Sequence, residues 1–190
     1  MATSKFGIVL LPDITTEGYV KKLAAEQPNN NLAPEFHVHL SLLHVVLERS
    51  RLPVVCKLID NLPISKPFPI ECHGILEQNG WHFLETQKSP TLTRVQKKIL
   101  PIARLRDGNT NFSWRTAATI EQKQAYGQYG YPNIGAAWSP HFTFGVTEPK
   151  KNKSTPLPQN WHGNIRAIAL GVIGDHGAVT KLLYVRKLFF

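Results

Sequence analysis

The sequence predicts a single α+β domain built on a largely antiparallel sheet, and three observations support this. The chain has 190 residues, of which 42% are hydrophobic and 18% charged, as in an ordinary globular protein with one core or two small lobes that share it. Strand-like and helix-like segments are mixed along the chain. Two pairs of strand-like segments are joined by short turns, which connect antiparallel neighbours.

The first part of the chain begins with a strand. Residues 6–11 are an apolar run ended by a Pro-Asp pair, which predicts a buried strand. Residues 15–27 have helical apolar spacing and predict a helix. The Asn-rich segment 28–34 predicts a loop. The apolar and β-branched run 36–46, with interleaved histidines, predicts a strand, and residues 50–61 predict a second helix.

The middle of the chain contains the clearest hairpin signal. Segments 68–78 and 81–86 flank an Asn-Gly pair, which predicts two antiparallel strands and a two-residue turn. A Ser-Pro pair opens a predicted helix over 89–106, in which Pro101 is expected to cause a kink or an end. Residues 116–126 predict a fourth helix.

The last part predicts strands and loops. Residues 127–137 are rich in Gly and Tyr and predict a loop. Residues 138–146 predict a strand, and the polar, Pro-containing segment 148–159 predicts a loop. Segments 165–173 and 179–188 flank a Gly-Asp-His-Gly turn and predict a second hairpin.

The excess positive charge lies in the second half of the chain. Residues 1–95 hold nine basic and nine acidic side chains, whereas residues 96–190 hold thirteen basic and four acidic ones. A basic half favours an anionic partner such as a phosphate, a nucleotide or RNA. A basic surface that only keeps the protein soluble gives the same counts, so charge alone leaves both interpretations open.

Composition also disfavours several classes of protein. Cys56 and Cys72 are the only cysteines, too few for a disulfide framework or a four-cysteine zinc site. The apolar run near the start is too short for a secretory signal, and no segment reaches the roughly 18 apolar residues of a membrane span. We therefore expect a soluble, cytoplasmic monomer that does not bind a membrane.

Two of the eight histidines begin the pattern His-x-Ser/Thr. One copy runs from His39 to Ser41 and the other from His141 to Thr143, each in a predicted strand with an apolar middle residue. Because side chains alternate along a strand, each copy places an imidazole and a hydroxyl on one face. One copy lies in each half of the chain, so two facing half-domains would bring both pairs to one site.

Two imidazoles and two hydroxyls suit phosphoester chemistry without a metal ion. One imidazole activates water and the other protonates the leaving oxygen, and histidine suits both tasks because its pKa lies near neutrality. A hydroxyl donates to a non-bridging phosphate oxygen. The pattern predicts His39 and His141 as catalytic residues and Ser41 and Thr143 as phosphate-binding residues, with no cofactor.

The stretches PEFHVHLSLLH and WSPHFTFG resemble the paired motifs of the 2H phosphoesterase superfamily, which includes 2′-5′ RNA ligase-like proteins and cyclic nucleotide phosphodiesterases. The resemblance implies one domain over residues 1–190, made of two interleaved lobes. It implies a bilobal, pseudo-twofold α+β fold whose mostly antiparallel sheets are flanked by helices, with the active-site cleft between the lobes. It also implies a 2′,3′-cyclic phosphate or 2′-5′ phosphodiester of an RNA end or nucleotide as substrate, hydrolysed or ligated in reverse.

The chain departs from the superfamily pattern at three places. Ser41 stands where Thr is commoner, which keeps the hydroxyl, and His37 stands where a Pro or small residue often precedes the motif. A helix often follows the second motif, where residues 148–159 here predict a loop. These departures leave the subfamily and the substrate open.

Aromatic residues near the second motif are candidates for substrate binding. Tyr126, Tyr129 and Tyr131 lie in or beside the Gly/Tyr-rich segment, and Trp138 lies just before the motif. Aromatic faces stack on any base. Tyrosines that pin their own loop, and a tryptophan that packs in the core, are the alternatives.

Two other functions also remain open. His37 and His39 can chelate a metal from one strand face, although His44 is expected on the opposite face, and such a pair would suit a metal-dependent hydrolase. The basic half would equally suit a module that binds RNA or a nucleotide without turnover.

Overall fold

The computed structural model describes residues 3–32, 36–111, 118–148 and 152–189. Its strands are β1 (Thr3–Pro12), β2 (Leu40–Glu48), β3 (Phe68–Gln78), β4 (Trp81–Thr86), β5 (His141–Val146), β6 (Lys153–Ile173) and β7 (Val179–Lys187). Its α-helices are α1 (Ile14–Ala25), α2 (Leu52–Asp60), α3 (Pro90–Ile99) and α4 (Ile120–Tyr129). Short 3-10 helices are η1 (Arg49–Arg51), η2 (Leu100–Leu105), η4 (Gly135–Ala137) and η5 (Asp175–Gly177).

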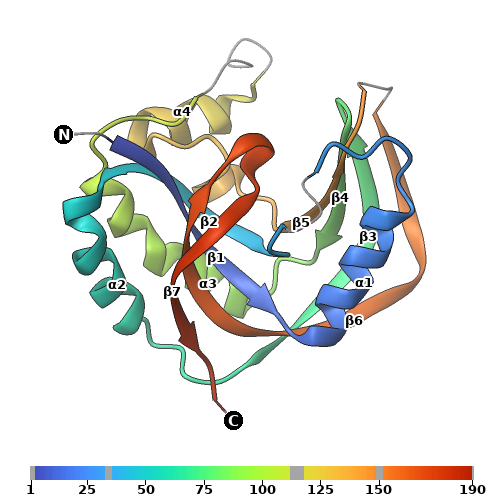
Figure 1. Ribbon diagram of the computed structural model, residues 1–190, viewed down its shortest axis with the longest axis horizontal. Coiled ribbons are helices and arrows are strands. Elements are labelled where there is room, and N and C mark those ends of the chain that lie inside the picture. Colours follow the sequence, from blue (N-terminus) through green and yellow to red (C-terminus); the bar gives the residue numbers. More distant parts are fainter. Residues whose placement is uncertain (1–2, 33–35, 112–117, 149–151, 190) are drawn as a thin grey trace.

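The described strands form one antiparallel sheet with helices packed around it (Figure 1). The strand order is β1-β2-β5-β4-β3-β6-β7, and β1 also pairs with β6. The strands from β1 to β6 therefore close into a ring, and β7 is added beside β6. The predicted α+β class with an antiparallel sheet is confirmed.

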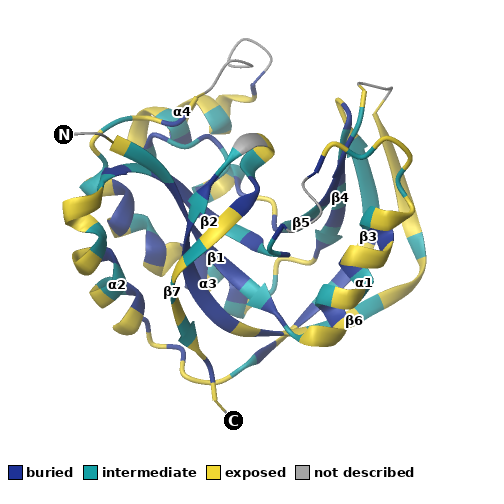
Figure 2. Ribbon diagram, in the orientation of Figure 1, coloured by how far each residue is buried: buried dark blue, intermediate teal, exposed yellow. Residues whose placement is uncertain are grey.

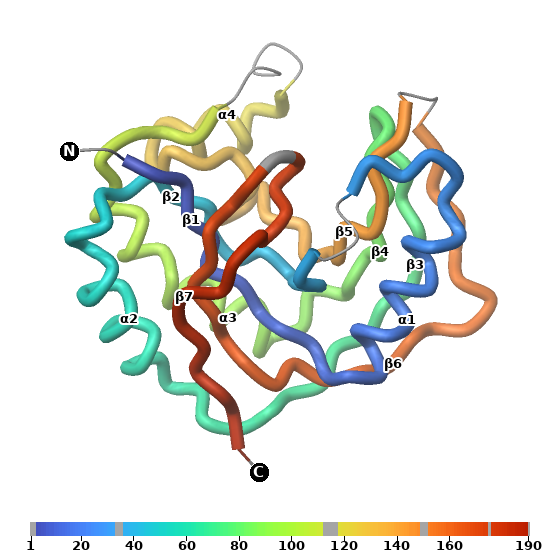
Figure 3. Tube along the Cα trace, in the orientation of Figure 1, coloured from blue at the N-terminus to red at the C-terminus, as the bar shows by residue number. Residues whose placement is uncertain are grey.

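The long strand β6 joins two halves of this sheet. Its first part pairs with β3, which continues to β4 and β5. Its last part pairs with β1 on one side and β7 on the other, and β1 continues to β2. Figure 3 shows β6 passing from the half that contains β3 and β4 to the half that contains β1 and β2. The motif strands β2 and β5 thus lie at the inner edge of each half.

Two of the helices, α1 and α3, pack on the half of the sheet opposite the strand that they follow in the chain. α1 follows β1 in the chain but packs chiefly against β5 and β6, where Tyr19 stacks on Trp161 with ring centroids 4.2 Å apart. α3 follows β4 but packs against β2 of the other half, and α2 packs against β6 and β7. α1 and α3 therefore each pack on the half of the sheet that they do not directly follow in the chain.

Local sequence explains several element boundaries. Asp13, Ser89 and Thr119 cap α1, α3 and α4, because a side-chain oxygen of each accepts a backbone N–H of the first turn. Asn79 and Gly80 have φ values of 52° and 83°, the positive pair that a type I′ hairpin turn requires. The first predicted hairpin is therefore confirmed, and β6 and β7 confirm the second.

The larger of two hydrophobic core clusters extends through both halves. Phe6 and Leu40 from one half and Leu84, Phe142 and Phe144 from the other are at most 1% exposed and belong to it. Figure 2 shows buried segments on strands of both halves. Burying a side chain of this size contributes about 1.5–3 kcal/mol. None of the described helices is long and apolar enough to cross a bilayer.

The predicted loop over 148–159 is wrong, because β6 already begins at Lys153. The pairing of β3 with β6 shifts so that residues 157–160 lie opposite His73 alone. Along this part, β6 pairs only with β3 among the described strands. A bulged strand with one partner tolerates Pro156 and Pro158, since no second strand needs the N–H that proline lacks.

Two helices differ in length from their predictions. The helix predicted over 89–106 ends at Ile99 and continues as η2, because Pro101 lacks the N–H of a regular α-helical hydrogen bond. The helix predicted over 116–126 runs from Ile120 to Tyr129, and so includes the first residues of the predicted loop 127–137. Positions 33–34, 116–117 and 149–151 of the predicted segments lie outside the described residues.

Candidate active site

A single bridge between β2 and β5 brings the two His-x-Ser/Thr motifs together. Leu40 pairs with Phe142 in antiparallel register, and these are the middle residues of the two motifs. On either side of an antiparallel bridge the residues lie opposite each other in reverse order. Each histidine therefore lies across from the hydroxyl residue of the other motif, and the arrangement around the bridge is locally twofold.

The four predicted site residues share one side of the bridge. The middle residues of the motifs, Leu40 and Phe142, are fully buried. The histidine and the hydroxyl residue of each motif are partly exposed. We call these side chains the motif face: His39, Ser41, His141 and Thr143. Two of the strand boundaries lie later than predicted, since His39 immediately precedes β2 and His141 is the first residue of β5.

Both motif histidines are oriented by the same local hydrogen bond. Nδ1–H of His39 donates to the carbonyl of His37 at 2.7 Å, and Nδ1–H of His141 donates to the carbonyl of Ser139 at 2.8 Å. A carbonyl oxygen only accepts, so Nδ1 carries the hydrogen in both rings. Nε2 of each ring is then the nitrogen that takes up or gives a proton.

The surroundings keep both rings neutral near pH 7. Desolvation, and then the charges of His141 and His37, lower the pKa of His39 to about 4, while its hydrogen bond to the His37 carbonyl opposes the shift. Desolvation also lowers the pKa of His141. A nearby anion favours the charged form of an imidazole, so a bound phosphate would raise both pKa values again.

The expectation that His44 points away from the motif face is wrong. Ser41 and Leu43 pair with consecutive residues of β1, which leaves Leu42 as the extra residue of a β-bulge. The bulge shifts the alternation of side chains by one residue. His44 therefore lies on the same side of β2 as Ser41, with its Nε2 at 3.1 Å from Ser41 Oγ.

The His44 ring is buried and neutral. Only 8% of the residue is exposed. Desolvation, and then the charges of His39, Lys5 and His141, lower the pKa of His44 to about 3. His44 thus meets Ser41 as an uncharged hydrogen-bond partner over the whole neutral pH range.

Trp138 lies beneath the motif face. It is 3% exposed, and its indole Nε1–H donates to the carbonyl of Ser41 at 2.9 Å. The side chain therefore links the segment before β5 to β2 and holds the Ser41 backbone in place. Of the two roles considered for Trp138 from the sequence, its burial favours packing in the core over contact with a substrate.

The three predicted substrate-binding tyrosines lie in different surroundings. Tyr131 stacks on His44 with ring centroids 4.7 Å apart, and desolvation raises its pKa to about 12. The hydroxyl of Tyr126 donates to the carbonyl of Thr110 at 3.1 Å, and Tyr129 packs against the core cluster. Of the three, Tyr131 is the one that contacts a partner of a motif residue.

The described residues near His37 and His39 do not add up to a metal-binding cluster. Among the described residues, no group of three or more His, Cys, Asp and Glu side chains is placed to hold a metal ion. His37 is partly exposed and contributes its carbonyl to the orientation of His39.

Phe83 also belongs to the site, although its sequence context did not single it out. It pairs with Thr143 in the β4–β5 ladder, and its ring centroid lies 4.4 Å from that of His141. Alternation over residues 81–86 shows from sequence that Phe83 shares a face with Trp81 and Glu85. Which face meets the motif depends on the partner strand, which the sequence does not reveal.

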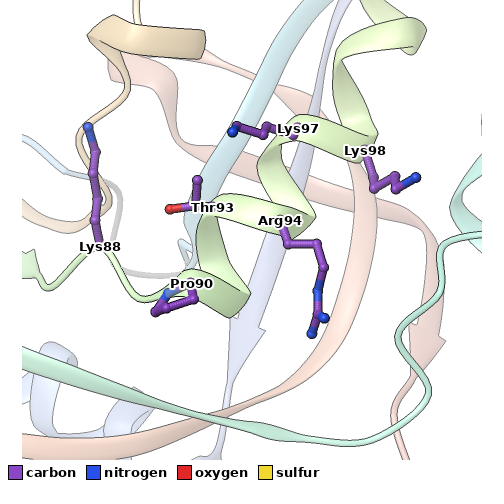
Figure 4. Close-up of a pocket in the computed structure, with 6 residues that line it drawn as sticks. All are labelled: Lys88, Pro90, Thr93, Arg94, Lys97 and Lys98. Carbon is purple, nitrogen blue, oxygen red and sulfur yellow. The ribbon is translucent and has the colours of Figure 1, made fainter.

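A cluster of basic side chains lines a pocket on α3 (Figure 4). The lining residues are Lys88, Pro90, Thr93, Arg94, Lys97 and Lys98. Four of them are cations, and none belongs to the motif face. Two of these cations, Lys97 and Lys98, belong to the second half of the chain, which carries the excess positive charge.

Three solved structures have the same fold over essentially the whole chain. They are LigT of E. coli complexed with 3′-AMP (TM-score 0.65, 13% identity, 100% of each chain), TT0787 of Thermus thermophilus (0.63, 13%, 97% of each chain) and a protein described as a phosphoesterase (0.62, 11%, 100% of each chain). No protein-family model matches the sequence, and no curated protein matches it. This chain therefore has the fold of LigT, the fold that the resemblance of its two motifs implies.

Proposed function

We propose that this chain is a metal-independent 2H-type phosphoesterase that hydrolyses a 2′,3′-cyclic phosphate or a 2′-5′ phosphodiester of an RNA end or nucleotide. The observation that carries the proposal is the matched pair of imidazoles. Each donates Nδ1–H to the carbonyl two residues earlier, and one bridge joins their motifs. Two such groups on one face are what acid and base catalysis of a phosphodiester needs.

In the proposed reaction, the two Nε2 atoms have opposite tasks. Nε2 of one neutral imidazole removes a proton from water as the water oxygen forms a bond to phosphorus. The bond from phosphorus to the 2′ or 3′ oxygen breaks, and Nε2–H of the other, protonated imidazole gives its proton to that oxygen. Each group typically contributes about 10²–10⁴-fold to the rate. The local twofold arrangement leaves open which histidine is the base.

The two hydroxyls are proposed to hold the non-bridging phosphate oxygens. Ser41 has one hydroxyl hydrogen, so it donates to phosphate only when His44 Nε2–H donates to Ser41 Oγ. Because His44 is neutral and buried, it is able to keep this role while the motif histidines exchange protons. His44 is thus a positioning residue for Ser41.

The choice of a nucleotide substrate is supported by the fold. The E. coli LigT structure that shares this fold holds 3′-AMP, a nucleoside monophosphate. Hydrolysis of a nucleoside 2′,3′-cyclic phosphate gives a product of that chemical class. The reverse reaction, attack of a ribose hydroxyl on the cyclic phosphate, would use the same two imidazoles for ligation.

Turnover of 2′,3′-cyclic AMP tests the proposed function. We expect the parent protein to release adenosine monophosphate in the presence of a chelator. His141→Gln and His39→Gln should each lower kcat about 10³-fold, since each removes one proton-transfer group. Thr147→Ser, at a hydroxyl that bonds to His82 outside the motif face, serves as the control variant with unchanged turnover.

Two outcomes would favour the alternatives instead. Turnover abolished by the chelator and restored by zinc would indicate a metal-dependent hydrolase. Salt-dependent nucleotide binding without turnover of any phosphodiester, unaffected by loss of both histidines, would indicate a binding module.

A further inference from the structure

Two partly exposed aromatic side chains of β4 continue the motif face beyond His141. Phe83 and Trp81 alternate with buried residues along β4, so both project from the same side of the strand. Phe83 pairs with Thr143 across the β4–β5 ladder. Paired residues of an antiparallel ladder share a face, so this is the side that carries the second motif.

The rings of these side chains form a row that starts at His141. The Phe83 ring lies 4.4 Å from the His141 ring and 6.1 Å from the Trp81 ring, to which it is inclined by only 11°. Trp81 in turn makes an edge contact with His176 of η5, in the turn between β6 and β7, at 5.8 Å. We call Phe83 and Trp81 the aromatic row.

The fold leaves part of the Phe83 side chain exposed. Phenylalanine is among the residues most often fully buried, yet Phe83 is partly exposed. In the part of the chain that the structure describes, Phe83 belongs neither to the buried core clusters nor to the apolar side chains packed on them, whereas Trp81 packs against the larger cluster. Partly exposed aromatic side chains beside a few polar groups are typical of the lining of ligand sites.

We propose, on the basis of the phosphoesterase function proposed above, that the aromatic row binds the nucleobase of the substrate by stacking. In a nucleoside 2′,3′-cyclic phosphate the base is one ribose away from phosphorus. A phosphate at His141 therefore places the base along the row that leads from His141 through Phe83 to Trp81. Since a ring face stacks on every base, the row selects for the presence of a base and not for its identity.

Two cyclic phosphates, one with a nucleobase and one without, test this proposal. The measured quantity is the ratio of kcat/KM for 2′,3′-cyclic AMP to kcat/KM for glycerol 1,2-cyclic phosphate, which has no base. Phe83→Leu and Trp81→Leu keep an apolar side chain but lose the ring, and each should lower this ratio about tenfold. Phe83→Tyr keeps the ring and should restore the ratio to within about twofold of the parent value.

Tyr19→Leu is the matched control, because Tyr19 stacks on Trp161 between α1 and β6 and should leave the ratio unchanged. Equal losses on both substrates in Phe83→Leu would overturn the proposal, because they would show that the ring only positions His141. If the parent turns over neither substrate, the proposed function fails, and calorimetry tests the row separately. Phe83→Leu should then weaken binding of adenosine 3′-monophosphate about tenfold more than binding of inorganic phosphate, and equal weakening would overturn the proposal.

Discussion

Each motif histidine has one nitrogen bonded to a backbone carbonyl and the other available for proton transfer, so the tautomers follow from the backbone. Among the described residues, the hydrogen-bond partner of Ser41 Oγ is Nε2 of His44 and not a carbonyl. Which of the two donates decides whether Ser41 has a hydrogen left for phosphate. The proposed site thus includes a residue outside the two His-x-Ser/Thr patterns, His44.

A double-mutant cycle between Ser41 and His44 tests this dependence. Ser41→Ala should lower kcat/KM for 2′,3′-cyclic AMP about 10²-fold, as does the loss of other donors to a developing anion. His44→Phe keeps an aromatic ring against Tyr131 and should lower kcat/KM about fivefold to tenfold, because one hydrogen bond contributes about 1 kcal/mol. In the Ser41→Ala background the same change should have almost no effect. An equal loss in both backgrounds would contradict the role given to His44.

The buried His44 should also make stability depend on pH. Its folded pKa, lowered to about 3, lies below the ordinary value of about 6.5 for an unfolded chain. Between these values the unfolded state binds more protons, so the free energy of unfolding rises with pH. Its stabilising contribution is complete above about pH 6.5 and is lost as the pH falls toward 3.

Urea unfolding at pH 7.5 and pH 5 measures this effect. His44 alone should lower the free energy of unfolding by about 2 kcal/mol at the lower pH. The difference between the two pH values should shrink by that amount in His44→Phe. A variant with the same pH dependence as the parent would show that His44 is not the buried group responsible.

At the scale of single elements, the bulge in β2 is the feature that sequence could not supply. The alternation of His39 and Ser41 with buried neighbours was predicted correctly, because period two holds from Phe36 through the motif to Leu42. His44 was assigned to the wrong face, because the extra residue Leu42 exists only relative to the register of β1. Phe83 was missed for the same reason, since its face is defined by the pairing of β4 with β5.

Substitution of one crowded glycine and one open glycine by alanine measures how closely the helices and strands pack. A Cβ added at Gly163 in β6 would lie 1.9 Å from Oγ1 of Thr16, which is fully buried in α1. Gly163→Ala should therefore lower the free energy of unfolding by about 1–3 kcal/mol, the usual cost of overpacking. A Cβ at Gly127 in α4 would meet nothing within 4 Å, and Gly127→Ala should raise it by about 0.5–1 kcal/mol.

Urea denaturation of both variants provides the comparison. A Gly163→Ala protein as stable as the parent would mean that α1 is not seated on β6 as described. A destabilised Gly127→Ala protein would contradict the open surroundings of that position in α4.

At the scale of the whole molecule, the pairing of β2 with β5 brings the two motifs to one bridge. The hairpins around Asn79 and the Gly174–Gly177 turn were predictable, because their signals are local. The ring of strands was not, because it depends on β6, whose prolines suggested a loop, and on the bridge between Leu40 and Phe142. The motif residues could be named from the sequence, but their closeness is a property of the fold.

The central claim is that His39 and His141 act as one catalytic unit, and the most direct measurement is the rate of the double variant. Groups that act as a unit have strongly non-additive effects. We predict that His39→Gln and His141→Gln each lower kcat for 2′,3′-cyclic AMP about 10³-fold, and that the double variant is slower by at most about tenfold more. Losses that multiply to about 10⁶-fold would contradict joint action of the two histidines in one step. Full turnover in either single variant would contradict the account altogether.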